Sequence, residues 1–100
     1  MQRQLILQQE ALDTLDSLAL KDAKKLRKVQ TALGKMEADI QNPGLRTHKY
    51  SVIKGDNGEQ VWEAYVENHT PSAYRIFWHY GPDLPDEPVI TIVAIEPHPK

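Results

Sequence analysis

The first half of the chain carries apolar residues at helical spacing. Leucines recur every third position over residues 12–18, and a second apolar series alternates spacings of three and four. That second series consists of Leu26, Val29, Leu33, Met36 and Ile40. Both series are typical of helices with one buried face, and they predict a hairpin of helices over 9–18 and 21–41 after a short strand over 4–8. Asn42-Pro43-Gly44 ends the second helix because proline cannot continue it.

Beyond Gly44 the hydrophobic period changes to two, and β-branched and aromatic residues predominate. This pattern predicts four strands, at 47–53, 60–68, 73–80 and 89–96. Because consecutive strands with short connections pair antiparallel, we expect an antiparallel meander with the helical hairpin across one face. The predicted fold class is therefore α+β, with an N-terminal short strand and a helical hairpin on a small antiparallel sheet, and residues 1–100 form one domain.

Alternation along two of these strands assigns their side chains to opposite faces of the sheet. The set expected beneath the helices is Trp62, Ala64, Val66, Tyr74, Ile76 and Trp78. The set expected on an open face is Glu63, Tyr65, Glu67, Arg75, Phe77 and His79. A slip of one residue would bury the charged set, so the hydrophobic pattern itself specifies the pairing of the strands.

Composition narrows the classes of function. The chain has no cysteine, which excludes disulfides, thiol nucleophiles and thiolate zinc sites. Its four histidines include no His-x-x-x-His pair and its glycines form no phosphate-binding or dinucleotide-binding motif, so we expect neither a metal nor a cofactor. Its apolar runs are too short for a signal peptide or a membrane span. We therefore expect a cytoplasmic protein that does not bind membranes.

Charge is distributed unevenly along the chain. Residues 1–54 carry ten Lys/Arg and six Asp/Glu, whereas residues 55–100 carry two and eight, so a net charge of −2 separates into +4 and −6. Lys24 and Lys28 lie off the apolar stripe of the second predicted helix, and they are candidates to contact nucleic-acid phosphates. A solvated helix surface is the alternative interpretation of this basic segment.

With these elements placed, the chain resembles the RelE/ParE superfamily of bacterial toxins from toxin–antitoxin pairs. The resemblance spans nearly the whole chain and is carried by four segments in order: Asn42-Pro43-Gly44-Leu45-Arg46-Thr47-His48-Lys49-Tyr50, Val61-Trp62-Glu63-Ala64, Tyr74-Arg75-Ile76-Phe77-Trp78 and Pro97-His98. It implies an antitoxin partner and one of two activities. Some members cleave ribosome-bound messenger RNA by attack of a 2′-hydroxyl on the adjacent phosphate, and others inhibit DNA gyrase.

The resemblance also suggests which residues would act on RNA. Arg75 matches the arginine that contacts the reacting phosphate in the nucleases, and His98 matches a C-terminal histidine beyond the last strand. Metal-free cleavage needs a base, a cation for the non-bridging oxygens and an acid for the leaving oxygen. We expect Glu63 or His48 as the base, Arg75 as the cation and His98 as the acid. The alternatives are an ion pair of Arg75 with Glu63 or Glu67, and a plain loop position for His48.

Further contacts to nucleic acid are expected around Arg75. Arg46 and Lys49 would contact phosphates beside it, and Tyr65 would stack on a base unless it is only half-buried packing. The leading hypothesis is a RelE-like toxin acting as a metal-independent endoribonuclease that inhibits translation. The alternative is a non-catalytic toxin directed at gyrase, or a member that only binds its antitoxin, because Glu63 and Tyr65 occupy the two basic positions of one nuclease subgroup.

Overall fold

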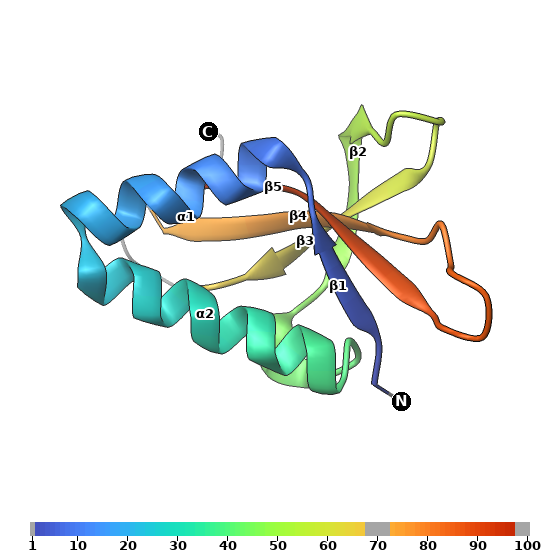
Figure 1. The fold of residues 1–100 in the computed structure, drawn as a ribbon, viewed down its shortest axis with the longest axis horizontal. Coiled ribbons are helices and arrows are strands. Elements are labelled where there is room, and N and C mark those ends of the chain that lie inside the picture. Colours follow the sequence, from blue (N-terminus) through green and yellow to red (C-terminus); the bar gives the residue numbers. More distant parts are fainter. Residues whose placement is uncertain (1, 68–72, 98–100) are drawn as a thin grey trace.

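The computed structural model describes residues 2–67 and 73–97, and it has two helices packed on one face of a five-stranded sheet (Figure 1). The elements are β1 (Gln4–Leu7), α1 (Gln9–Lys21), α2 (Ala23–Ala38), a single 3-10 turn η1 (Pro43–Leu45), β2 (His48–Lys54), β3 (Gln60–Tyr65), β4 (Tyr74–Tyr80) and β5 (Val89–Pro97). The predicted α+β class is confirmed. No helix among the described residues is long and apolar enough to cross a membrane.

A single residue, Asp22, separates the two helices. Its backbone N–H donates to the carbonyl oxygen of Leu18 over 2.8 Å, and its carboxylate accepts from the backbone N–H of Lys25 over 3.0 Å. Asp22 therefore closes α1 and caps α2, as an aspartate at a helix N-terminus commonly does. The predicted hairpin is confirmed, but α1 runs three residues further than expected and α2 is shorter at both ends.

The sheet has the strand order β1-β5-β4-β3-β2. Strands β2 to β5 form the predicted antiparallel meander, but β1 pairs parallel with β5, so the expectation of a purely antiparallel sheet was wrong. The rule for short connections does not apply to β1, because the whole helical hairpin follows it (Figure 1). Hydrogen bonds from Gln4 N to Pro88 O and from Gln8 N to Ile92 O, at 3.0 and 2.9 Å, join β1 to the last strand.

The main core lies between the helices and the sheet. Trp62 pairs with Trp78 and Ala64 with Ile76 across β3 and β4, so the predicted register is confirmed. The buried members of this core are Ala11, Leu18, Val29, Ala32, Met36, Ile40, Leu45, Ala64, Ile76, Trp78, Ile90, Ile92 and Ile95. Leu26, Leu33 and Trp62 pack against them, as the helical stripes predict. Burial of this apolar surface is the main stabilising term of the fold.

The opposite face is not the open surface that the sequence suggested. Glu63, Arg75 and His79 do share that face, yet they are only 1%, 7% and 2% exposed. A small second core covers its middle, made by Val61, Phe77 and Ala94 with Tyr50, Ile53 and Val93 packed against them. The register of β2 against β3 is irregular between Lys49 and Lys54, and Figure 1 shows β2 turning away from the direction of the other strands. This bend carries β2 side chains over a face that alternation alone would leave open.

Candidate functional site

His48 and Glu63 lie directly opposite each other on β2 and β3. Nε2 of His48 lies 2.6 Å from Oε1 of Glu63, and Nδ1 lies 3.1 Å from the carbonyl oxygen of Arg46. A carbonyl oxygen only accepts, so Nδ1 is the protonated donor in that bond. Nε2 lies at ion-pair distance from the carboxylate, so the contact is attractive when the imidazole also carries a proton on Nε2. In that form the pair holds a proton that can be transferred.

The backbone of Arg46 helps to set this geometry. Arg46 follows η1 in the left-handed conformation, with a φ of 48°, and its N–H donates to Pro43 O over 3.2 Å. For a residue with a side chain this conformation costs on the order of 1 kcal/mol or more. The turn leaves the carbonyl oxygen of Arg46 within reach of His48, while the Arg46 side chain is exposed to solvent. Arg46 thus orients the imidazole through its main chain.

Arg75 and Tyr65 form the second half of the site, and they face each other across β3 and β4. The guanidinium carbon lies 3.9 Å from the centroid of the Tyr65 ring. Nη1 of Arg75 donates to the backbone oxygens of Glu67 and Tyr74, at 2.8 and 3.1 Å. Within residues 2–67 and 73–97 no carboxylate pairs with this guanidinium, and its Nε has no hydrogen-bond partner. A buried cation with unused donors favours an anion such as phosphate.

The two halves are contiguous. The rings of His48 and Tyr65 are 5.8 Å apart between centroids and meet edge to face at 66°. His48, Glu63, Tyr65 and Arg75 therefore form one group, called here the Arg75 cluster. It offers a transferable proton on His48 and Glu63 beside a cation held on an aromatic ring. These are two of the three elements that metal-free phosphodiester cleavage needs.

Lys25, which the sequence did not single out for the site, anchors this cluster to α2 through Glu67. Nζ of Lys25 lies 2.5 Å from Oε1 of Glu67, Nζ of Lys28 lies 3.2 Å from Oε2, and the Tyr74 N–H donates to Oε1 over 3.3 Å. Burial raises the pKa of the Glu67 carboxyl, but the hydrogen bonds from both lysines outweigh it, so the pKa lies below its ordinary value. The i, i+3 spacing of Lys25 and Lys28 predicts a common partner.

A basic groove runs beside the Arg75 cluster, between α2 and the end of β3. It has a volume of about 250 Å³ and is lined by Lys28, Thr31, Ala32, Lys35, Gly44, Tyr65 and Val66. Lys28 thus has a place beside the site in addition to its bond with Glu67, and its side chain is 48% exposed. Lys24 is exposed at the start of the same helix. The predicted contact of these lysines with nucleic acid remains a prediction.

The structure does not bring all the predicted residues together. Lys49 was expected beside Arg75, but its Nζ lies over the ring of Trp62, 5.9 Å from the centroid, and therefore on the other face of the sheet. Alternation explains this, because His48 faces Glu63 and the next residue must face the opposite way. The alternative role of Arg75, an ion pair with Glu63 or Glu67, is not found among the described residues. His98 lies outside the described residues.

No protein-family model and no curated protein matches the chain. Solved structures match it over nearly its whole length. The YoeB/ParE toxin from Agrobacterium tumefaciens is 11% identical, with a TM-score of 0.69 over 96% of this chain and 99% of the toxin. The chain has the fold of the YoeB/ParE toxins. The predicted RelE/ParE-like architecture is thereby confirmed.

Two structures from Staphylococcus aureus extend the YoeB comparison. A YoeB dimer is 14% identical, with a TM-score of 0.61 over 99% of this chain and all 100% of that protein. YoeB in a heterotetrameric YoeB–YefM toxin–antitoxin complex is 13% identical, with a TM-score of 0.59 over the same shares of the two chains. The likeness therefore includes a YoeB structure solved with its antitoxin.

Proposed function

We propose that this chain is the toxin of a toxin–antitoxin pair and that it cleaves RNA at the Arg75 cluster. The observation that carries the proposal is the buried guanidinium of Arg75, which lies against Tyr65 without a carboxylate partner among residues 2–67 and 73–97. The YoeB/ParE toxin fold supports the toxin assignment, and the YoeB–YefM complexes support an antitoxin partner. The proposed place of action is the cytoplasm, on ribosome-bound messenger RNA.

In this mechanism the 2′-hydroxyl of one nucleotide attacks the adjacent phosphorus and the 5′-oxygen of the next nucleotide leaves. Arg75 contacts the non-bridging oxygens through those guanidinium N–H groups that do not donate to backbone carbonyl oxygens. Charge builds on those oxygens in the transition state, and one preorganised donor of this kind contributes about 10²–10³ in rate. The products are a 2′,3′-cyclic phosphate and a free 5′-hydroxyl.

His48 has the role of the acid. Its Nδ1 donates to the carbonyl oxygen of Arg46, and when Nε2 is also protonated beside Glu63 the imidazole can give a proton to the leaving 5′-oxygen. Its side chain is 47% exposed and meets the substrate, whereas the Glu63 side chain, at 1%, balances the imidazolium charge from inside. The 2′-hydroxyl proton then passes to a second group, for which His98 is the candidate. The sequence-based expectation, with His48 or Glu63 as the base and His98 as the acid, is the alternative assignment.

Induction in a host without the antitoxin tests the proposal. Wild-type protein should arrest growth and leave messenger RNA fragments with 2′,3′-cyclic phosphate ends. Arg75→Ala should abolish both effects, whereas Arg27→Ala, which removes an exposed cation elsewhere on α2, should not. If induction of the folded protein leaves growth unchanged, the result would contradict the assignment as a toxin. Arrest with intact messenger RNA and damaged DNA would replace the nuclease with a gyrase-directed toxin.

A further inference from the structure

The basic groove between α2 and the end of β3 adjoins the Arg75 cluster through one shared side chain. Tyr65 belongs to both, because its ring centroid lies 3.9 Å from the guanidinium carbon of Arg75 and the same residue lines the groove. The groove has a volume of about 250 Å³. A ligand that reaches Arg75 therefore has further space beside it, between Tyr65 and α2.

Small residues leave this groove hollow. Thr31 and Ala32 line it from α2, and Gly44 lines it from the η1 turn. A Cβ on Gly44 would lie 3.9 Å from Nζ of Lys35, so the ammonium group of Lys35 lies at this turn. The hydroxyl of Thr31 donates to the carbonyl oxygen of Arg27 over 2.9 Å, and its own oxygen can still accept a hydrogen bond.

The groove carries an excess of positive charge. Lys28 and Lys35 both line it, and no Asp or Glu is among its lining residues. The two lysines are seven residues apart on α2, which places them on one side of the helix and about 10 Å apart along its axis. Lys28 shares the carboxylate of Glu67 with Lys25, so one positive charge remains uncompensated there. Lys35 pairs with no carboxylate within residues 2–67 and 73–97.

Lys28 is also held in place before any ligand arrives. Its Nζ lies 3.2 Å from Oε2 of the buried Glu67, yet its side chain remains 48% exposed. A side chain that is already ordered loses less conformational entropy when it binds an anion. On the other side of Tyr65, Nε of Arg75 is buried and has no partner in the part of the chain that the structure describes. Donors on both sides of one ring favour a ligand with two negative groups.

We propose that the basic groove binds the phosphate next to the scissile one on the same RNA strand, with Lys35 as its main contact and Lys28 as a second. The inference rests on the proposed function, which puts the scissile phosphate at Arg75. A nucleic-acid strand carries one phosphate per nucleotide, so a strand bound at Arg75 has a second negative group to place nearby. A dinucleotide can then occupy only the Arg75 position, whereas a trinucleotide can occupy both.

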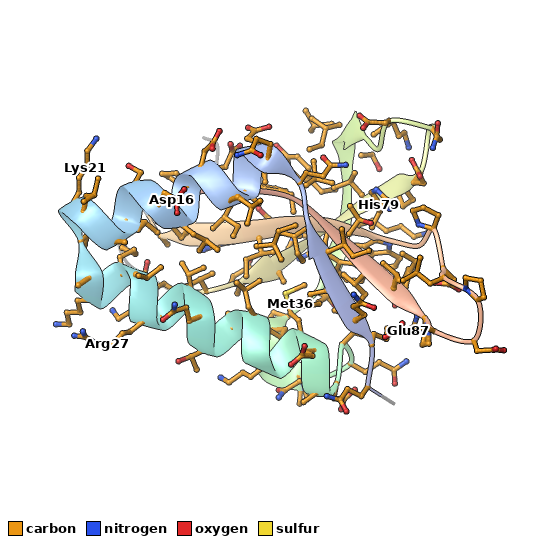
Figure 2. All side chains as sticks on the ribbon, in the orientation of Figure 1. Asp16, Lys21, Arg27, Met36, His79 and Glu87 are labelled. Carbon is orange, nitrogen blue, oxygen red and sulfur yellow. The ribbon has the colours of Figure 1, made fainter. Side chains whose placement is uncertain are left out.

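Titration of the full chain with 2′-O-methyl uridine oligonucleotides that lack terminal phosphates tests the groove by NMR, because the methyl group prevents cleavage. The trinucleotide should shift the side-chain signals of Lys35 and the backbone amides of Thr31 and Gly44 in a saturable way. Lys35→Ala should weaken the trinucleotide about fivefold at low salt, since one exposed charge pair is lost. It should leave the dinucleotide unchanged. Lys21→Ala removes an exposed cation where the two helices join (Figure 2), and it should affect neither ligand.

The salt dependence provides a second measurement. Lys35→Ala should lower the slope of log affinity against log salt concentration by about 0.7 for the trinucleotide, as expected when one contact to a single-strand phosphate is lost. Absence of saturable shifts in the groove would overturn the proposal. Weakening of the trinucleotide by Lys21→Ala as large as that by Lys35→Ala would also overturn it, as would equal weakening of both oligonucleotides by Lys35→Ala.

An acidic peptide distinguishes RNA from a protein as the occupant of the groove. If triglutamate with blocked ends shifts the Lys35 and Gly44 signals at lower concentration than the trinucleotide does, the groove belongs to an acidic protein partner and the proposal is overturned. The titration does not depend on RNA cleavage. Binding in the groove by a protein that cuts no messenger RNA in cells would contradict the nuclease proposal alone, and cleavage without groove shifts would contradict this inference alone.

Discussion

The guanidinium of Arg75 lies against the ring of Tyr65, with its carbon 3.9 Å from the ring centroid, on the face of the sheet that both helices leave uncovered. A cation held on an aromatic ring away from water contributes up to about 2 kcal/mol. The same guanidinium also satisfies two backbone carbonyls. Arg75 therefore stabilises the end of the β3–β4 pair as well as being the proposed phosphate contact, and its replacement should affect both properties.

We expect Arg75→Ala to abolish RNA cleavage and to lower the free energy of unfolding by about 1–3 kcal/mol, since it removes the ring contact and leaves two carbonyls without their donor. On the open surface where the sequence alone placed Arg75, the same substitution would change stability little. Arg75→Lys keeps the charge but not the forked geometry, so it should retain more stability and still lose most activity. Denaturant unfolding and cleavage of a defined RNA measure the two effects. Full activity of folded Arg75→Lys would contradict a forked phosphate contact.

Coupling between His48 and Glu63 should be measurable in a double-mutant cycle. The 2.6 Å contact predicts that His48→Ala and Glu63→Gln are non-additive in stability, with an interaction energy of about 0.5–3 kcal/mol. Cleavage should fall in each single variant, and the double variant should be little worse than either, because the two residues act as one unit. Lys49→Ala offers the matched control, since Lys49 faces Trp62 and should add independently to Glu63→Gln.

Acid should weaken the anchor between α2 and the sheet. The folded-state pKa of Glu67 lies below its ordinary value of 4.5, so its stabilising effect is fully present above about pH 4.5 and is lost as the pH falls through the lowered pKa. Glu67→Gln should therefore flatten the decline of stability below pH 4.5, measured by denaturant unfolding across the acid range. A decline as steep as in the wild type would show that the ion pairs with Lys25 and Lys28 contribute little.

Glu96 should change the dependence of stability on pH in the opposite direction to Glu67, and it therefore serves as a control. Desolvation and the nearby charge of Glu10 raise the pKa of Glu96, so its protonated form stabilises the fold at low pH and that contribution is lost as the pH rises through the raised pKa. Glu96→Gln should alter the pH dependence of stability just above pH 4.5, where Glu67→Gln should not.

Trp78 should be the most costly single truncation in the main core. It is 1% exposed and stacks on Trp62, with ring centroids 5.8 Å apart. Trp78→Ala should lower the free energy of unfolding by about 3–5 kcal/mol. Trp78→Phe should cost much less, because the indole Nε1 has no partner among the described residues and phenylalanine removes that buried donor. Val52→Ala, at a side chain 78% exposed, should stay within about 0.5 kcal/mol.

The period of the hydrophobic pattern was enough to place the elements and the faces of the sheet. Alternation is a local property of an extended chain, so the sequence alone put Trp62 under the helices and Tyr65 on the same face as Arg75. The shared face of Glu63 and Arg75 followed from the same rule. Helix ends were less certain, because the capping hydrogen bond of Asp22 decides where α1 stops and α2 starts.

Only the tertiary structure decided how exposed that face is and what its residues touch. The bend of β2 brings Tyr50 over Phe77 and His48 onto Glu63, and such a bend depends on strand pairing and twist that no single segment encodes. Glu67 lies just past the end of β3, where alternation no longer applies, and its carboxylate reaches α2. Packing also brings together residues from distant segments, such as Lys25 with Glu67 and His79 with the β2–β3 turn. Such pairs carry no periodic signal in the sequence. Sequence therefore determined which side chains face the same way, and packing determined which of them meet.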